Sequence, residues 1–317
     1  MSEFDLIQRY FTRATPGAQL GVGDDAALLR VDSGMELAVS TDMLVSGTHF
    51  FPDADPCLLG HKTLAVNLSD MAAMGAQPRW ATLALSLHQA DTAWLEGFSA
   101  GFFALAQQYG VELIGGDTTH GPLNLCVTIM GVLPQGTALR RADAKIGDDV
   151  WVSGMLGDAA LALAHLKGRV QLSSEEYSSC AGSLHRPEPR IALGQMLRGV
   201  AHGAIDISDG LLADLGHILE NSRVGAEIRF DALPVSRVLR SWLGQPLGTH
   251  CALAGGDDYE LCFTVPAVRR SEVGEISRRA ALPLTRIGTI IAGNACRVVA
   301  ADGSVMSIGE AGYDHFK

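Results

Sequence analysis

The stretch PCLLGHKTLAVNLSDMAAMG, residues 56–75, reads as one long helix. Its apolar residues recur at the spacing that keeps one helix face buried: Leu58, Leu59, Leu64, Ala65, Leu68, Met71 and Ala72. Pro56 suits the first helical turn, and Gly75 followed by Pro78 suits the exit. The stretch therefore predicts a helix with a buried face, around which the rest of the chain is organised.

Asp70 is the only acidic residue of this helix, and its neighbours are mostly apolar. Burying an ionised carboxylate without a partner is costly, so Asp70 needs one if it is buried. The nearest base along the helix, Lys62, lies two turns back and is displaced around the axis. We therefore expect a partner from elsewhere, and the other conspicuous aspartates favour a cation. On the alternative interpretation, Asp70 lies at the solvent edge of an amphipathic helix.

Length and composition describe an ordinary globular chain. The 317 residues allow one large or two medium domains, with 47% hydrophobic and 19% charged residues. No apolar run is long enough to cross a membrane, and the opening MSEFDLIQRYF lacks the apolar core of a signal peptide. The six cysteines form no CxxC pair, so neither a zinc site nor a disulfide framework is indicated. We expect a cytoplasmic protein without a membrane partner.

The net charge of −11 argues against a nucleic-acid-binding surface. It is compatible with phosphate ligands, provided that metal ions supply positive charge. Magnesium sites of this kind use one or two carboxylates each, completed by water and substrate phosphates.

Hydrophobic periodicity predicts alternating helices and strands in both halves of the chain. In order, the first half contains helix 3–12, strand 35–44, helix 56–75, strand 80–87, helix 94–109, strand 111–114 and strand 123–133. The second contains strand 150–152, helices 157–166 and 190–199, strand 204–207, helix 210–220 and strands 226–230, 259–265 and 284–291. The stretch 173–179 is either a surface loop or a helix start. The polar segment 134–149 separates the halves, which gives domains 1–137 and 138–317.

The segment GVGDDA, residues 21–26, formally matches the dinucleotide-binding pattern G-x-G-x-x-A. That pattern requires a strand before it and a helix after it, and TPGAQLGVGDD is a poor strand. Asp24 and Asp25 would also repel a pyrophosphate unless a metal ion lay between them. We therefore reject the dinucleotide interpretation; a simple turn remains possible.

A stronger signal is a set of aspartates that follow apolar segments: Asp24, Asp42, Asp70, Asp117, Asp206 and Asp209. Ligands of α/β proteins commonly bind outside the carboxyl ends of the strands, and aspartates placed there suit Mg²⁺. Any one of them could instead be a turn or capping residue, and Asp209 in front of a helix is the clearest such case. Six capping residues by coincidence are much harder to accept.

Six linked motifs make the pattern specific. They are GVGDDAALL, STDMLVSGTHF, NLSDMAAMGA, LIGGDTT, DISDGLLADLGHI and LAGGDDYELCFTVP, in this order from residue 21 to 266. This series resembles the thiamine-monophosphate kinase family, and the closing GYDHF (312–316) fits as well. The resemblance implies an α/β (α+β) fold of two domains, like aminoimidazole ribonucleotide synthetase, with dimerisation through the N-terminal sheet. It also implies transfer of the γ-phosphoryl group of ATP to thiamine monophosphate, giving thiamine diphosphate.

The resemblance also implies roles for individual residues. The implied ligands of a cluster of several Mg²⁺ ions are Asp24, Ser40, Thr41, Asp42, Asp70, Asp117, Asp206 and Asp209. The implied ATP contacts are Gly116, Asp117, Arg141 and Ser208. The implied thiamine monophosphate contacts are His49, Asp257 and Tyr313. Asp42, Asp70, Arg141 and Asp209 are the residues expected to carry catalysis. Taken singly, Arg141 would be a solvated linker charge, His49 a surface histidine and Tyr313 a packing residue.

The chain departs from the family pattern at Asp257, where the family usually has Glu in Gly-Gly-Glu-Asp-Tyr-Glu. Aspartate keeps the charge but reaches about 1.5 Å less far, one carbon–carbon bond. We expect Asp257 to keep the substrate contact directly or through water; the alternative is that Asp258 or Glu260 has replaced it.

Three other functions compete with the kinase. Selenophosphate synthetase would need a reactive Cys and a Lys near the N-terminus, whereas the first ones here are Cys57 and Lys62. Aminoimidazole ribonucleotide synthetase is disfavoured because the substrate-side motifs match the kinase. A non-catalytic regulator that binds nucleotide and Mg²⁺ is disfavoured because every implied metal ligand is present.

Overall fold

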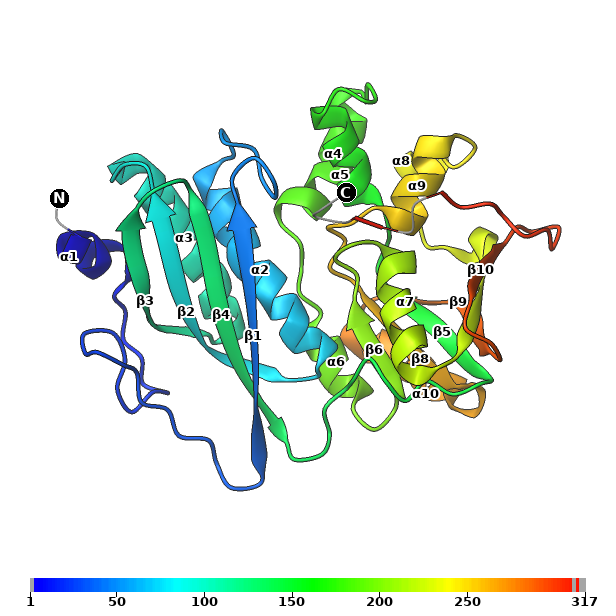
Figure 1. The fold of residues 1–317 in the computed structure, drawn as a ribbon, viewed down its shortest axis with the longest axis horizontal. Helices are drawn as coiled ribbons and strands as arrows, with labels where there is room; N and C mark the ends of the chain where they lie inside the picture. Colours follow the sequence, from blue (N-terminus) through cyan, green and yellow to red (C-terminus); the bar gives the residue numbers. More distant parts are fainter. Residues whose placement is uncertain (1–2, 310–311, 314–317) are drawn as a thin grey trace. The chain divides into compact units, whose positions relative to one another are not determined.

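The computed structural model describes residues 3–309 and 312–313 and divides the chain into two compact units, each with its own sheet (Figure 1). With one exception, the boundary between the units lies between Gly136 and Thr137. The short segment Ala72–Gly75, at the end of the predicted long helix, belongs to the second unit. No helix within the described residues is both long and apolar enough to cross a membrane.

The sheet of the first unit has four strands. They are β1 (Met35–Val45), β2 (Gln77–Leu87), β3 (Glu112–His120) and β4 (Asn124–Pro134). Their order is β1-β4-β2-β3, with β2 and β3 parallel and the other neighbours antiparallel. β1 and β3 are therefore the two edges of this sheet, which matters for the site described below.

Helices cover only one face of this sheet among the described residues of the unit (Figure 1). They are α2 (Pro56–Ala73) and α3 (Thr92–Tyr109), which confirms the predicted helix at 56–75. α2 and α3 approach closely at Gly101, which has no side chain. A Cβ atom there would lie only 1.9 Å from the carbonyl oxygen of Cys57. The predicted helix at 3–12 is instead a short helix α1 (Glu3–Leu6) followed by a π-helical turn η1 (Ile7–Phe11).

The opposite face of the sheet carries exposed apolar side chains. Leu37, Val39 and Met43 of β1 are 43%, 56% and 54% exposed. Side chains of a strand alternate between faces, so these residues lie on the side away from α2 and α3. These three side chains therefore line one exposed face of the edge strand β1.

The sheet of the second unit has six strands in the order β10-β7-β9-β5-β8-β6. They are β5 (Asp148–Ser153), β6 (Gly203–Asp206), β7 (Gly225–Arg229), β8 (Leu261–Pro266), β9 (Leu284–Ile291) and β10 (Cys296–Val299). Only β10 and β7 are parallel; every other pair is antiparallel. All side chains of β8 from Leu261 to Val265 are buried, so both faces of the sheet are covered.

Up to Gly309, this unit contains seven α-helices. They are α4 (Asp158–Leu166), α5 (Ser174–His185), α6 (Ile191–Leu197), α7 (Leu211–Ser222), α8 (Arg237–Arg240), α9 (Pro246–Ala254) and α10 (Arg270–Ala280). Two short 3₁₀ turns, η2 (Phe230–Ala232) and η3 (Ala267–Arg269), complete it. The stretch 173–179 is the start of α5, where Ser173 and Glu176 form a capping box.

The structure corrects the end of one predicted strand. The prediction ended a strand at 114, but β3 continues to His120 because β2 pairs with it residue by residue, Ala84 with Asp117 and Leu87 with His120. Asp117 is thus inside a strand. Asp42 likewise lies three residues before the end of β1. Asp206 is the last residue of β6, one residue before the predicted end of that strand at 207.

Candidate active site

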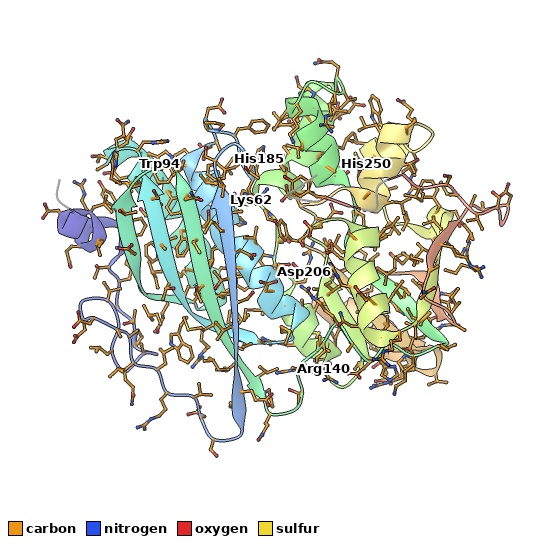
Figure 2. All side chains as sticks on the ribbon, in the orientation of Figure 1. Lys62, Trp94, Arg140, His185, Asp206 and His250 are labelled. Atoms are coloured by element: carbon orange, nitrogen blue, oxygen red, sulfur yellow. The ribbon has the colours of Figure 1, made fainter. Side chains whose placement is uncertain are left out.

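In the first unit, β1 and α2 bring Ser40, Asp42 and Asp70 to the helix-covered side of the sheet. Ser40 and Asp42 pair with buried residues of β4, so both face α2. The Ser40 hydroxyl donates to Asp70 Oδ2 at 2.5 Å, and the Asp42 amide donates to Asn67 Oδ1 at 3.2 Å. Asp70 therefore has a partner from another element, as expected, and this partner is a hydroxyl. Lys62 on the same helix is buried (Figure 2).

The donor set at this place fits Mg²⁺ by its chemistry. Ser40, Asp42 and Asp70 offer hydroxyl and carboxylate oxygens, the ligands that this hard cation prefers. Across residues 3–309 and 312–313, no group of three or more His, Cys, Asp or Glu side chains stands in a metal-binding arrangement.

Thr41 points to the other face of the sheet. Its side chain is exposed, and its hydroxyl lies 2.9 Å from the hydroxyl of Thr128 on β4. Alternation along β1 makes this unavoidable, because Ser40 and Asp42 on either side face α2. The side chain of Thr41 is therefore not brought together with those of Ser40 and Asp42.

Asp117 is also separated from Asp42 within the first unit. It lies on β3, at the edge opposite β1, three strand spacings or about 14 Å away. Across the sheet, Asp117 pairs with Ala84, Ala84 with Cys126, and Cys126 with Met43. Paired residues share a face, so Asp117 lies on the face of Met43, opposite that of Asp42. One copy of this unit does not bring the two carboxylates to one ion.

Asp24 lies in an exposed loop, where its carboxylate accepts a hydrogen bond from the Asp25 amide at 3.1 Å. The segment 12–34 around it contains neither a helix nor a strand of a sheet. This agrees with rejecting the dinucleotide pattern, which needs both.

His49 and Gly116 both have evident structural roles. His49 Nδ1 accepts a hydrogen bond from the Val45 amide at 3.0 Å, which fixes the ring at the end of β1. Gly116 has φ of +147°, and a Cβ atom there would lie 1.9 Å from the carbonyl oxygen of Leu83. Only glycine allows that approach of β3 to β2, whether or not a nucleotide binds nearby.

In the second unit, the loop after β6 gathers several predicted residues. Asp206 at the strand end is buried (Figure 2), and Ser208 and Asp209 are half-buried. The Ile207 amide donates to the Glu260 carbonyl, and the Tyr259 amide donates to the Ile207 carbonyl, both at 2.8 Å. These bonds extend the pairing of β6 with β8 into the loop and so fix where the loop begins.

Asp214 was missed by sequence reasoning. Its Oδ2 atom accepts hydrogen bonds from three consecutive amides, Ser208 at 2.9 Å, Asp209 at 3.0 Å and Gly210 at 3.1 Å. Burial, and then the charge of Asp209, raise the pKa of Asp214 to about 7, although these three bonds oppose the shift. The only sequence signal was an acid one turn into a helix whose N-cap, Gly210, has no side chain.

Two predicted substrate contacts join the same loop. The Asp257 amide donates to the Ser208 carbonyl at 2.9 Å, and the Tyr313 amide donates to the Asp209 carbonyl at 3.0 Å. The Tyr259 hydroxyl donates to Asp257 Oδ1 at 3.1 Å. Asp257 and Tyr259 both have positive φ, +70° and +50°, a backbone strain that tends to accompany functional loops. The rest of the GYDHF motif, residues 314–316, lies outside the described residues.

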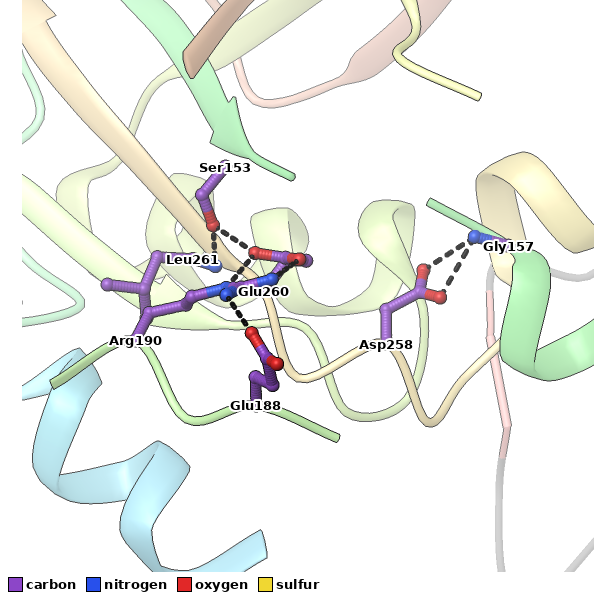
Figure 3. Close-up of polar contacts among 7 residues, drawn as sticks. All are labelled: Ser153, Gly157, Glu188, Arg190, Asp258, Glu260 and Leu261. Carbon is purple, nitrogen blue, oxygen red and sulfur yellow. Dashed lines mark hydrogen bonds and ion pairs between the residues drawn. The ribbon is translucent and has the colours of Figure 1, made fainter. Parts of the chain in front are cut away.

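The other two acids of the GGDDYE segment are engaged with the scaffold (Figure 3). Asp258 accepts from the Gly157 amide through both oxygens at 2.9 Å, and burial raises the pKa of its carboxyl well above the usual range. Glu260 accepts from Arg190 at 2.5 and 2.7 Å and from the Ser153 hydroxyl at 2.5 Å. These contacts disfavour the alternative that Asp258 or Glu260 replaces Asp257.

Arg141 lies beside the edge strand β6. The preceding carbonyl, that of Arg140, accepts from the Ala204 amide of β6 at 2.9 Å. Arg140 itself forms an ion pair with Asp143, whereas the side chain of Arg141 is exposed. Both side chains are exposed, so the structure leaves the predicted ATP contact of Arg141 as a prediction.

Comparison with known proteins places this fold in a class. The AIR synthase related protein N-terminal domain matches residues 23–133, and the C-terminal domain of the same name matches residues 145–301. The chain is thus a two-domain AIR synthase-related protein, which confirms the predicted fold class.

Individual proteins and solved structures that are similar to this chain identify one family within this class. A thiamine-monophosphate kinase of Salmonella typhimurium is 47% identical over 99% of this chain and 98% of the relative. The crystal structure of the thiamine-monophosphate kinase from Stenotrophomonas maltophilia is 49% identical, covers 96% of both chains and has a TM-score of 0.85. A structure named AaThiL complexed with AMPPCP and TMP is 30% identical over 99% of this chain and 96% of that chain, with a TM-score of 0.79. The chain belongs to the thiamine-monophosphate kinase family.

Proposed function

We propose that this protein transfers the γ-phosphoryl group of ATP to thiamine monophosphate and releases thiamine diphosphate. The observation that carries this proposal is the hydrogen bond between the Asp257 amide and the Ser208 carbonyl. It joins a predicted substrate contact to a predicted ATP contact, so the two phosphate-bearing ligands would meet at one loop. The family relative solved with AMPPCP and TMP supports the same pair of ligands.

The reaction demands positioning and charge neutralisation more than covalent chemistry. Both reactants are polyanions, and the acceptor phosphate is already ionised near neutral pH, so no general base is needed. Mg²⁺, when bound, supplies positive charge against both phosphates. In the first unit, Asp24, Ser40, Asp42 and Asp70 would hold it; in the second unit, Asp206 and Asp209 would do so. Arg141 adds a fixed cation at the edge of β6.

The expected kinetic mechanism is sequential, because phosphate passes directly between the two substrates. The Ser40 hydroxyl donates to Asp70 at 2.5 Å, but on this proposal both side chains hold Mg²⁺, so Ser40 is not a nucleophile with Asp70 as its free base. Purified protein with ATP, Mg²⁺ and thiamine monophosphate should release ADP and thiamine diphosphate in equal amounts, with intersecting lines in initial-rate plots. A ping-pong pattern, or labelled protein after incubation with ATP alone, would contradict direct transfer.

The same assay decides between the kinase and the remaining alternatives. A non-catalytic regulator would bind ATP without releasing ADP, and another ATP-dependent enzyme of the superfamily would release ADP only with a different acceptor. ADP release that depends on thiamine monophosphate is the result that supports the kinase.

We further propose a homodimer formed through the sheet of the first unit. Leu37, Val39 and Met43 offer an apolar face that a second copy would cover. The dimer would also explain Asp117, which one copy keeps away from Asp42: where the β3 edge of one copy lies beside the β1 edge of the other, the Asp117 carboxylate would serve the site of the partner. On this proposal the first unit binds Mg²⁺ and ATP and dimerises, while the second contributes substrate and metal contacts.

We propose a cytoplasmic location because the cysteines form no disulfide bonds. All six lie within the described residues and are free thiols. Free thiols are typical of a reducing compartment.

Asp257 tests the substrate side of the site. Replacing it by Ala should raise the KM for thiamine monophosphate roughly tenfold, about 1.4 kcal/mol, while the KM for ATP hardly changes. Asp257→Asn is the matched control, because asparagine tolerates the positive φ and can still accept from Tyr259. If Asp257→Asn also raises the KM for thiamine monophosphate, the lost charge causes the effect. If only Asp257→Ala raises it, the altered backbone conformation of the loop causes it. Asp257→Glu should be tolerated, and an unchanged KM in the Ala variant would remove Asp257 from the site.

A further inference from the structure

One carboxylate accepts hydrogen bonds from the backbone amides of all three residues of Ser208–Gly210. Asp214, buried in the first turn of α7, accepts all three amides of this tripeptide at 2.9 to 3.1 Å. Two of these amides belong to the loop before α7 and the third to its N-cap, Gly210. Backbone amides turned into the protein need an acceptor, and Asp214 supplies it from the first turn of the helix.

The carbonyl groups of Ser208 and Asp209 bind two segments that are distant in the sequence. A trans peptide points its N–H and C=O in opposite directions. The Asp209 amide points at Asp214, so the Ser208 carbonyl of that peptide points away, and it accepts from the Asp257 amide at 2.9 Å. In the next peptide the Gly210 amide points at Asp214, and the Asp209 carbonyl accepts from the Tyr313 amide at 3.0 Å.

Both segments approach this backbone at a glycine. A Cβ atom on Gly256, just before Asp257, would lie 2.4 Å from the Ser208 carbonyl oxygen. A Cβ atom on Gly312, just before Tyr313, would lie 2.8 Å from the Asp209 carbonyl oxygen. Such distances leave no room for a side chain, so each segment fits only when the two carbonyls keep their present direction.

We infer that Asp214 is a positioning residue for the proposed kinase reaction. It touches neither substrate in this scheme; it sets the plane of two peptides, and those peptides set where Asp257 and Tyr313 lie. One carboxylate thereby couples the predicted nucleotide and metal residues, Ser208 and Asp209, to the predicted substrate residues. The kinetic part of this inference rests on the proposed function, whereas the structural part does not.

The test compares Asp214→Ala and Asp214→Asn with Asp149→Ala. Asp149 is the matched control: it is a fully buried acid of the same unit, held by Arg270 at 2.5 and 2.8 Å and by Arg286 at 3.0 Å, away from this loop. Hydrogen exchange without substrates is measured at the amides of residues 257 and 313. Their acceptors are backbone carbonyls that none of the substitutions removes, so a purely local loss at Asp214 would leave them protected.

In Asp214→Ala these two amides should exchange at least about ten times faster than in the wild-type protein. The KM values for ATP and thiamine monophosphate should both rise about tenfold or more, because both sets of contacts are displaced. Asp214→Asn keeps an acceptor oxygen and should return both KM values to within about threefold of wild type. Asp149→Ala should lower the Tm and leave both KM values and both amides unchanged.

Unchanged exchange at residues 257 and 313 in Asp214→Ala would overturn the inference. So would equal KM changes in Asp214→Ala and Asp149→Ala, because general destabilisation would then explain both. If the wild-type protein phosphorylated nothing, the proposed function would fail, while the exchange result would still decide whether Asp214 positions the two segments.

Discussion

Asp42→Asn and Asp70→Asn should each lower kcat by on the order of 10²-fold, about 2.7 kcal/mol of lost transition-state stabilisation. Both carboxylates lie on the α2 side of β1, Asp70 accepting from Ser40 at 2.5 Å. Asparagine has nearly the same shape, and its oxygen can still accept from that hydroxyl, so the fold should persist with little change in Tm. What is lost is the negative charge that would hold Mg²⁺ against two polyanions.

Activity and metal dependence are measured together. We expect each variant to need more Mg²⁺ for half-maximal rate and to stay below wild type at saturating Mg²⁺. Asp91→Asn is the matched control, because Asp91 caps α3 through its side chain and asparagine caps equally well. Near-wild-type kcat in both site variants at saturating Mg²⁺ would show that these carboxylates are not metal ligands in catalysis.

The sequence predicted the elements of the site better than the contacts within it. The helix at 56–75 and the strand at 35–44 follow from local periodicity, and both are confirmed as α2 and β1. The bond between Ser40 and Asp70 depends on how the strand lies against the helix, which no local pattern specifies. Sequence reasoning could therefore say that Asp70 needed a partner without saying which residue it was.

Asp117 and Asp214 show two further limits. β3 is longer than its apolar run because β2 pairs with it through His120, and this pairing is non-local, so Asp117 was misplaced at a strand end. Asp214 was missed because its partners are backbone amides, and any residue type supplies those. By contrast, Asp257 and Tyr313 were found through the family motifs, and the structure brings both to the loop that holds Ser208 and Asp209.

A heterodimer of Asp70→Asn and Asp117→Asn chains should regain activity that both parent homodimers lack. In a symmetric dimer with Asp117 supplied by the partner, one site of the heterodimer contains both substitutions and the other contains none. The purified heterodimer, isolated through two different tags, should therefore show about half of the wild-type kcat per dimer. If Asp117 instead served its own chain, both sites would carry one substitution and the activity would stay near that of the parents.

The control is a heterodimer of Asp42→Asn and Asp70→Asn chains. Asp42 and Asp70 lie on the same side of β1 in one unit, so they serve the same site, and each site of this heterodimer keeps one defect. It should remain as inactive as its parents, and recovery in it would reveal contaminating wild-type dimer. Light scattering that shows a monomer at micromolar concentration would contradict the dimer itself. The expected rescue rests on the proposed dimer: β1 and β3 are opposite edges of one sheet, so one copy keeps Asp117 away from Asp42, and the partner would have to supply it.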